Sequence, residues 1–191
     1  AAAAGKGADL EAAAFAQASS TLISVFDLIS GMGIAKSDME GNAKTVATLA
    51  AAAPGSTLKS LVDAELDGQD AKAVKKVAEN GKTAACALLW LTRALYFIQK
   101  LLEELVNTDK KMSDCVYAGY EVSLRPHHGM MIRGTFSVAL KAAPYRSDFM
   151  KKLGPDEESV LADLRGVLPH IDGLIKEIAG YLGGKDEKLF A

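Results

Sequence analysis

Residues 83–107 carry apolar side chains around most of the circumference of a predicted helix. A helix with that pattern has almost no solvent face, so other elements have to surround it. The segment therefore predicts a domain built around one central helix. Thr92 and Arg93 interrupt its most apolar stretch well short of the roughly 18 residues needed to cross a bilayer, so we do not expect it to span a membrane.

The rest of the chain repeats the helical period, and no long stretch alternates apolar and polar residues as a strand would. The five prolines fall between periodic segments or at helix starts. We expect one all-α domain of about eight helices over residues 1–191, with residues 1–7 disordered and outside the fold. The periodic segments cover residues 8–30, 38–53, 57–66, 71–79, 83–107, 113–125, 126–143, 145–153 and 156–182.

Composition argues against several functions. A formal net charge of −2 gives no overall attraction for nucleic acid. The two cysteines, Cys86 and Cys115, fall in apolar helical patterns and predict small buried side chains in a reducing compartment. His127 and His128 are adjacent and would point about 100° apart on a helix, so they cannot hold one metal ion together. Without a nucleotide-binding loop or an activated nucleophile, we expect neither an enzyme nor a cofactor.

Asp38 and Asn42 are the first candidates for a binding site. We expect Ser37 to cap a helix that begins at Asp38, which would place the acid at the positive end of the helix dipole. Asp38 and Asn42 are four residues apart and share a helical face. A carboxylate and an amide together suit a ligand with several hydroxyl groups, such as a sugar. The structural alternative is a helix-start acid beside a solvated amide.

Trp90, the only tryptophan, and His128 are further candidates. An indole can support the CH face of a pyranose ring, and Arg93, three residues further on, would place a cation beside it. His128 stands where a helical pattern begins and could donate one hydrogen bond. Each residue also has a structural alternative: core packing for Trp90, an ion pair for Arg93, and a bond to a buried carbonyl for His128.

Four stretches, in this order, make the chain similar to the glycolipid transfer protein family. They are SDMEGN at 37–42, LLWLTRALYFIQ at 88–99, HHGMMIRGTFSVAL at 127–140 and AAPYRSDFMKKL at 142–153. The resemblance implies a two-layer all-α sandwich that encloses an apolar pocket for lipid chains, with a polar head-group site at the surface. It also implies a cytoplasmic, monomeric carrier that binds a glycosphingolipid and transfers it between membranes through transient contact with their surfaces.

The resemblance also implies individual roles. Asp38 and Asn42 match the acid and amide that bind the first sugar and the ceramide amide, Trp90 matches the indole under that sugar, and His128 matches the histidine that bonds the amide carbonyl. The implied head-group residues are Asp38, Asn42, Lys44, Thr45, Trp90, Arg93 and His128. The implied lipid-chain residues are Phe26, Phe97 and Phe136, and the implied membrane-docking residues are Met130 and Met131.

Two positions depart from the family pattern. Thr45 stands where glycolipid binders of the family usually have lysine, and the nearest lysine is Lys44. Met130 replaces a tryptophan that often docks on the membrane. Three alternatives stay open: a ceramide-1-phosphate carrier, a sphingolipid sensor that acts through a protein partner, and a helical interaction module with no ligand. The phosphate-binding branch typically has lysine at the position of Asn42 and arginine at that of Trp90, so both positions favour a sugar.

Overall fold

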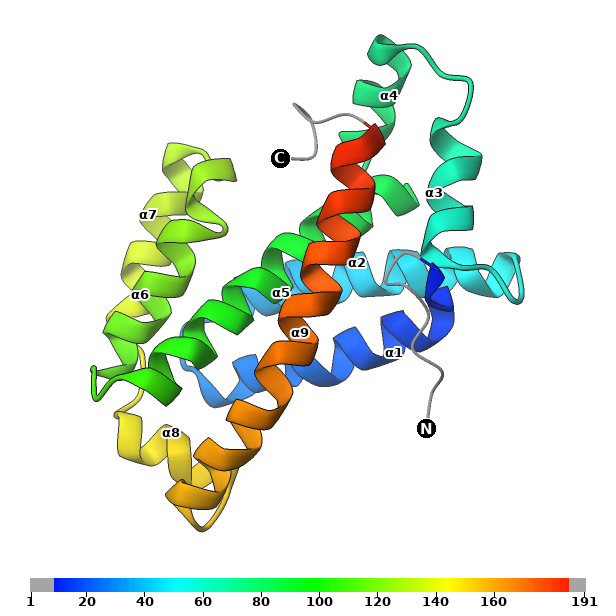
Figure 1. Cartoon of the computed structure of the whole chain (residues 1–191). Coiled ribbons are helices and arrows are strands. Elements are labelled where there is room, and N and C mark those ends of the chain that lie inside the picture. The colour runs from blue at the N-terminus through cyan, green and yellow to red at the C-terminus, as the bar shows by residue number, and fades with distance from the viewer. Residues whose placement is uncertain (1–8, 186–191) are drawn as a thin grey trace. The chain divides into compact units, whose positions relative to one another are not determined.

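A computed structural model describes residues 9–185 of the chain, and the expectation for residues 1–7 lies outside that range. The described residues form nine α-helices and two short 3-10 helices, so the predicted all-α class is confirmed (Figure 1). The elements are α1 Ala12–Ile23, η2 Ser24–Leu28, α2 Gly33–Ala52, α3 Leu58–Leu66, α4 Ala71–Ala78, α5 Ala84–Asn107, α6 Met112–Val122, η3 Arg125–His127, α7 Met130–Leu140, α8 Arg146–Leu153 and α9 Glu157–Lys185.

The helices divide into two compact units, each assembled from separate stretches of sequence. The described parts of Ala1–Ile23, Ser37–Thr92 and Gly173–Ala191 form the first unit. Ser24–Lys36 and Arg93–Asp172 form the second unit. Helices α2, α5 and α9 each contribute residues to both units. The expectation of a single domain over the whole chain stays a prediction.

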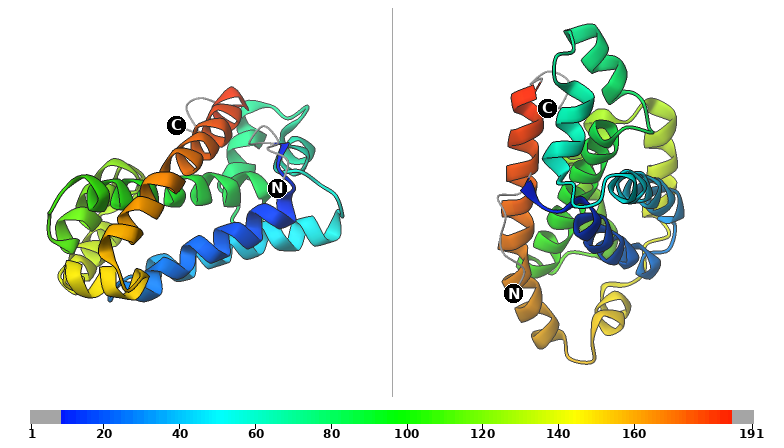
Figure 2. Two further views of the ribbon diagram at one scale, coloured as in Figure 1. Left: turned by 60° about the horizontal axis from the view of Figure 1, so that its bottom comes forward. Right: turned by 90° about the vertical axis from the view of Figure 1, so that its right-hand side faces the viewer.

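In the first unit, α1 and α2 lie side by side (Figures 1 and 2). Both helices carry buried alanines, and alanines of both line one hollow in this unit. The segment that follows α2 returns to the start of α1, where the backbone N–H of Ala12 donates to the Ser56 carbonyl at 3.0 Å. Thr57 and Ser60 then form a capping box that starts α3.

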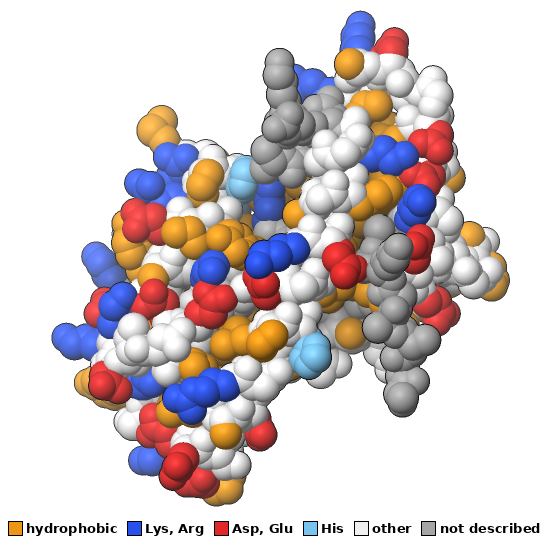
Figure 3. All heavy atoms as spheres, in the orientation of Figure 1, with side chains coloured by type: hydrophobic (Ala, Val, Ile, Leu, Met, Phe, Trp, Pro, Cys, Tyr) orange, Lys and Arg blue, Asp and Glu red, His pale blue; other side chains and the backbone are white. Residues whose placement is uncertain are grey.

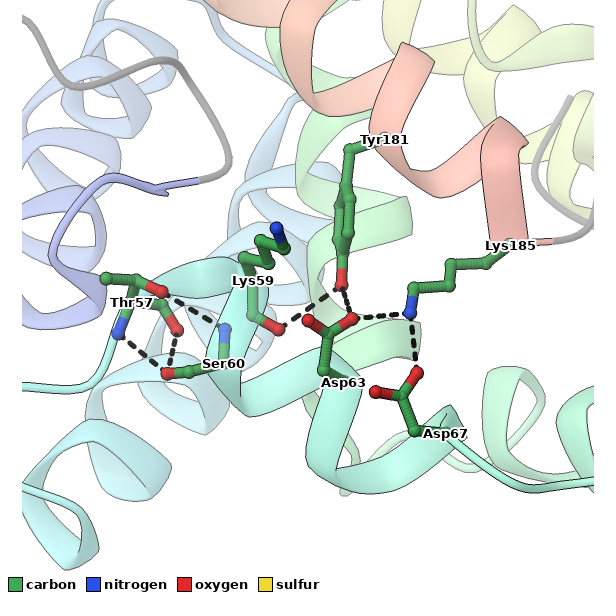
Figure 4. Close-up of polar contacts among 7 residues, drawn as sticks. All are labelled: Thr57, Lys59, Ser60, Asp63, Asp67, Tyr181 and Lys185. Carbon is green, nitrogen blue, oxygen red and sulfur yellow. Dashed lines mark hydrogen bonds and ion pairs between the residues drawn. The ribbon is translucent and has the colours of Figure 1, made fainter.

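The end of α9 is fastened to α3 by a polar cluster in the first unit (Figure 4). The Tyr181 hydroxyl donates to Asp63 Oδ1 at 2.7 Å and contacts the Lys59 carbonyl at 3.2 Å. Lys185 Nζ lies 2.5 Å from Asp63 Oδ1 and 2.7 Å from Asp67 Oδ1. Partial burial of Asp63 disfavours its charge, but the hydrogen bonds from Lys185 and Tyr181 outweigh that effect and lower the pKa of the carboxyl.

This cluster predicts how stability depends on pH. The folded-state pKa of Asp63 lies below its unfolded value, so its contribution is present above about pH 4 and is lost as pH falls through the folded pKa. We expect Asp63→Asn to lower the free energy of unfolding at neutral pH and to flatten its decline in acid. Urea unfolding across pH measures this, with the exposed Asp109→Asn as the control. An unchanged acid slope in Asp63→Asn would contradict the assignment.

The second unit has an aromatic core. The rings of Phe26 and Phe97 stack with centroids 5.7 Å apart, Phe97 meets Phe136 edge-on at 6.3 Å, and Phe136 stacks on Tyr120 at 4.1 Å. These side chains come from η2, α5, α6 and α7. Gly119 lets α6 approach α5 closely, because an added Cβ would lie 3.0 Å from the Phe97 carbonyl oxygen.

Three predicted helices differ from the structure. The helix expected over residues 8–30 is α-helical only over Ala12–Ile23 and continues as the 3-10 segment Ser24–Leu28. The helix expected from Asp38 begins earlier, at Gly33, so Ser37 is not its cap and Asp38 is not in its first turn. The helix expected over residues 126–143 is broken: η3 ends at His127, His128 is extended with φ −93° and ψ 135°, and α7 begins only at Met130. The extended residue interrupts the helical hydrogen bonds.

Helix α5 spans Ala84–Asn107, within one residue of the predicted bounds. Among the described residues it is the one helix that is long and apolar enough to cross a membrane, so Thr92 and Arg93 shorten its apolar stretch less than the sequence suggested. However, 78% of its apolar window is buried inside the molecule. That burial is typical of a core helix of the kind the sequence predicted.

Candidate functional site

The Asp38 and Asn42 side chains lie together on α2. Asn42 Nδ2 donates to the Asp38 carbonyl oxygen at 3.0 Å and approaches Asp38 Oδ2 at 3.4 Å. Asp38 is exposed, whereas Asn42 and Thr45 are partly buried on the same side of the helix. The buried neighbours Met39 and Ala43 anchor α2 beside them. The structure thus presents a carboxylate and an amide at the edge of a packed helical surface, as the spacing predicted.

Lys44 points to a different side of α2. It precedes Thr45 by one residue, which places it about 100° away around the helix. It lines a hollow of about 540 Å³ in the first unit, together with Glu40 and with alanines of α1 and α2. Thr45 itself donates its hydroxyl to the Gly41 carbonyl at 3.1 Å. Neither residue therefore supplies a cation on the face that Asp38 and Asn42 share.

Trp90 and Arg93 follow one another along the less buried stripe of α5. Both are partly exposed, whereas Leu91 and Thr92 between them are buried. Helical spacing puts the two side chains on neighbouring positions of one face. Trp90 is therefore not a fully enclosed core residue, and its indole is accessible in part to a ligand.

Arg93 and the histidine pair belong to the second unit. Neighbouring atoms displace part of the water around the imidazole and so lower the pKa of His127 although the residue is exposed, and the nearby Arg93 and His128 act in the same direction. His127 is exposed, while His128 is partly buried between η3 and α7. The extended backbone at His128 turns its ring toward Tyr120 on α6, whose hydroxyl lies 3.2 Å from His128 Nδ1.

The three predicted lipid-chain residues come together in the second unit. Phe26, Phe97 and Phe136 are buried and contact one another through Phe97, as described above. Side chains from three distant parts of the sequence thus share one apolar core. A lipid chain that entered this core would replace ring contacts with contacts to its methylene groups.

The predicted docking residues are strongly exposed. Met130 is 89% exposed and Met131 is 82% exposed, both in the first turn of α7. Of the eleven residues of α7, only Phe136 is buried, although the helix is largely apolar. Hydrophobic side chains lie at the surface over α6 and α7, beside Lys and Arg side chains (Figure 3). An apolar helix with so little burial is typical of a surface that contacts another apolar phase.

Sequence reasoning missed Tyr120. The apolar periodicity of residues 113–125 marks Tyr120 as a core residue of the predicted helix. Nothing in the sequence spacing links Tyr120 to His128. Only the break between η3 and α7 brings the two side chains together. Within residues 9–185, no group of three or more His, Cys, Asp or Glu side chains is arranged to hold a metal ion.

Comparisons with known sequences agree with the residue pattern. A family model described as "Glycolipid transfer protein (GLTP)" matches residues 10–155. A glycolipid transfer protein from Aureobasidium melanogenum is 36% identical over 179 residues, which cover 91% of this chain and 84% of that protein. The residues matched by the family model include the stretches that carry Asp38, Trp90 and His128.

Solved structures share the fold. HET-C2, a fungal glycolipid transfer protein, matches with a TM-score of 0.75 and 31% identity over 94% of this chain and 88% of that one. A mutant of Arabidopsis ACD11 complexed with C12 ceramide-1-phosphate matches with a TM-score of 0.84 over 96% and 88%. Because the sequence of this ACD11 mutant is only 19% identical to this chain, the match supports the fold alone. On the family model, the relative and the shared fold, the chain belongs to the glycolipid transfer protein family.

Proposed function

We propose that this protein binds one glycosphingolipid and carries it between membranes without a chemical reaction. The observation that carries the proposal is family membership combined with the side chains at four positions, Asp38, Asn42, Trp90 and His128. A carboxylate acceptor, an amide, an aromatic plane and an imidazole suit a sugar joined to an amide-linked lipid.

Each head-group residue has a distinct role in this proposal. Asp38 accepts hydrogen bonds from sugar hydroxyls and from the lipid amide N–H. The bond from Asn42 Nδ2 to the Asp38 carbonyl orients the amide, so that its oxygen accepts from the ligand. Trp90 stacks on the sugar, Arg93 adds a donor beside it, and His128 donates to the amide carbonyl. Thr45 and Lys44 complete the polar surface of α2 at greater distance from the sugar.

The lipid chains occupy the aromatic core of the second unit in this proposal. Phe26, Phe97 and Phe136 make ring contacts that a chain can replace, since both kinds of contact are apolar. Helix α7 has few buried residues to hold it in place, so its displacement costs little lost packing. We therefore infer that the chains enter by shifting α7 and separating Phe136 from Phe97.

A vesicle assay tests the function directly. Donor vesicles contain fluorescent galactosylceramide and a non-transferable quencher, and recovery of fluorescence reports transfer to acceptor vesicles. We expect the protein to accelerate recovery in proportion to its concentration. Binding without transfer would favour a sensor that acts through a protein partner, and absence of any binding would favour an interaction module.

The buried free thiols of Cys86 and Cys115 are compatible with the cytoplasmic, monomeric carrier that we propose.

We propose that the first turn of α7 inserts into the membrane surface. Met130→Ser/Met131→Ser should weaken vesicle binding at least tenfold, because burying each methionine contributes about 1.5–3 kcal/mol. Vesicle sedimentation measures the partition coefficient, and Val167→Ser, at an exposed position on α9, is the matched control. On neutral vesicles the binding should depend little on salt, since the inserted side chains are uncharged. A steep salt dependence, or unchanged binding in the double variant, would contradict insertion.

A further inference from the structure

Tyr120, His128 and Phe136 form one packed group in the second unit. Tyr120 is only 2% exposed, and its ring lies almost parallel to Phe136, with an angle of 4° between the ring planes. The His128 ring centroid lies 5.7 Å from the centroids of both other rings. The imidazole is therefore held by two aromatic side chains while its Nδ1 faces the Tyr120 hydroxyl at 3.2 Å.

The burial of Tyr120 decides which group donates in this hydrogen bond. Within the part of the chain that the structure describes, His128 is the one hydrogen-bond partner of the Tyr120 hydroxyl. If Nδ1 carried the proton and donated, the buried hydroxyl hydrogen would have no protein acceptor, which is unfavourable. If the hydroxyl donates, both atoms are satisfied. Tyr120 is therefore the donor and Nδ1 of His128 the acceptor.

Arginine side chains lie near this packed group. Arg125 and Arg133 lie close enough to Tyr120 to oppose the effect of burial, which raises the pKa of its hydroxyl. Arg133 Nε also donates to the Arg125 carbonyl at 3.1 Å, which holds its guanidinium beside η3. Arg93 lies close enough to His127 to contribute to the lowered pKa of that imidazole. A second proton on the imidazole would sit on Nδ1 and would again leave the buried Tyr120 hydroxyl hydrogen without a protein acceptor, so this geometry requires a ring with one N–H.

We propose that Tyr120 is a positioning residue that holds His128 in its Nε2–H tautomer and thereby turns this nitrogen into a donor for an amide carbonyl of the lipid. This inference rests on the proposed function, in which His128 contacts that carbonyl. In the opposite tautomer Nε2 would be an acceptor and would repel the carbonyl oxygen. Tyr120 therefore makes the site selective for lipids with an N-acyl group.

Tyr120→Phe tests the inference, because it removes the hydroxyl and keeps the ring that stacks on Phe136. A long-range proton–nitrogen correlation spectrum of the lipid-free protein reports the tautomer, with the His128 signals assigned by comparison with His128→Gln. The parent should show the Nε2–H form, and Tyr120→Phe a mixture of both forms. Galactosylceramide affinity should fall about two- to tenfold, the effect of losing one hydrogen-bond arrangement. Tyr117→Phe, whose exposed hydroxyl bonds Glu121, is the matched control and should change neither readout.

A double variant separates positioning from simple destabilisation. The glutamine introduced by His128→Gln supplies an amide N–H and has no tautomers, so in that background the further change Tyr120→Phe should leave galactosylceramide affinity unchanged. An Nδ1–H tautomer in the parent, or a single Nε2–H tautomer retained in Tyr120→Phe, would overturn the inference. So would a tautomer change without loss of affinity, or the same loss in the His128→Gln background. If the parent binds no glycolipid, the proposed function fails, while the spectrum still reports the tautomer.

Discussion

Asp38→Val should suppress the transfer of galactosylceramide while the helical circular dichroism and the melting temperature stay near those of the parent. Asp38 is exposed on α2, so its loss removes little packing from the first unit. In the proposed complex the same carboxylate accepts hydrogen bonds from the ligand. Removing it leaves ligand donors without an acceptor, at about 1.5–3 kcal/mol for bonds to a charged group. That range corresponds to about ten- to a hundredfold weaker binding.

The matched control for this variant is Glu40→Val. Glu40 is an exposed carboxylate on the same helix, but it lines the hollow between α1 and α2 and lies away from the Asn42 side. Both variants remove one negative charge and add one valine, so a general effect of charge or helix propensity would appear in both. Equal transfer by Asp38→Val and the parent would remove Asp38 from the site. Equal loss in both variants would point to net charge as the cause.

The face of α2 could be predicted, but its beginning could not. Four-residue spacing alone puts Asp38 and Asn42 on one side, and the observed bond between them agrees. Ser37 and the acids after it have the character of a helix start, yet α2 already begins at Gly33. Gly31 has φ +87°, and an added Cβ there would lie 2.9 Å from the Ala139 carbonyl oxygen in the second unit. Glycine therefore suits the turn at this position. The turn ends before Gly33, where α2 begins, which is earlier than the polar residues suggest. Tertiary packing outweighed a local capping signal there.

The interruption of the helix at His128 explains a second difference between the prediction and the structure. Pro126 is predicted at a helix start, which its fixed φ allows, and it does lie in the opening of a helical turn. That turn is the 3-10 segment η3, and the chain is then extended at His128 and Gly129 before α7 begins. The contact between Tyr120 and His128 depends on this interruption of the helix, so helical periodicity could not predict the contact. The resemblance of the surrounding motif made His128 a candidate site residue, while only the fold showed that Tyr120 is its hydrogen-bond partner.

We expect head-group choice to depend on positions 42 and 90. A phosphate carries up to two negative charges and requires several cationic donors. On the described surface of α2, the position one turn after Asn42 is Thr45, and Lys44 points toward the hollow beside α1. The Asp38 carboxylate would repel a phosphate, whereas it would accept hydrogen bonds from sugar hydroxyls. Trp90 offers a stacking plane that a sugar uses and a phosphate does not. We therefore expect galactosylceramide or lactosylceramide to be carried well and ceramide-1-phosphate poorly.

Asn42→Lys/Trp90→Arg should reverse this preference. The two changes add charge-assisted donors and remove the stacking plane, and each new donor to a phosphate contributes about 1.5–3 kcal/mol. We expect the ratio of ceramide-1-phosphate to galactosylceramide affinity to rise at least a hundredfold. Competition of unlabelled ceramide-1-phosphate against labelled galactosylceramide measures this ratio, and Thr48→Lys, at an exposed position of α2, controls for added charge. If ceramide-1-phosphate already competes with the parent as well as unlabelled galactosylceramide does, the sugar assignment of Trp90 and Asn42 is wrong. If the double variant keeps the parent's preference, head-group choice is determined by residues other than these two.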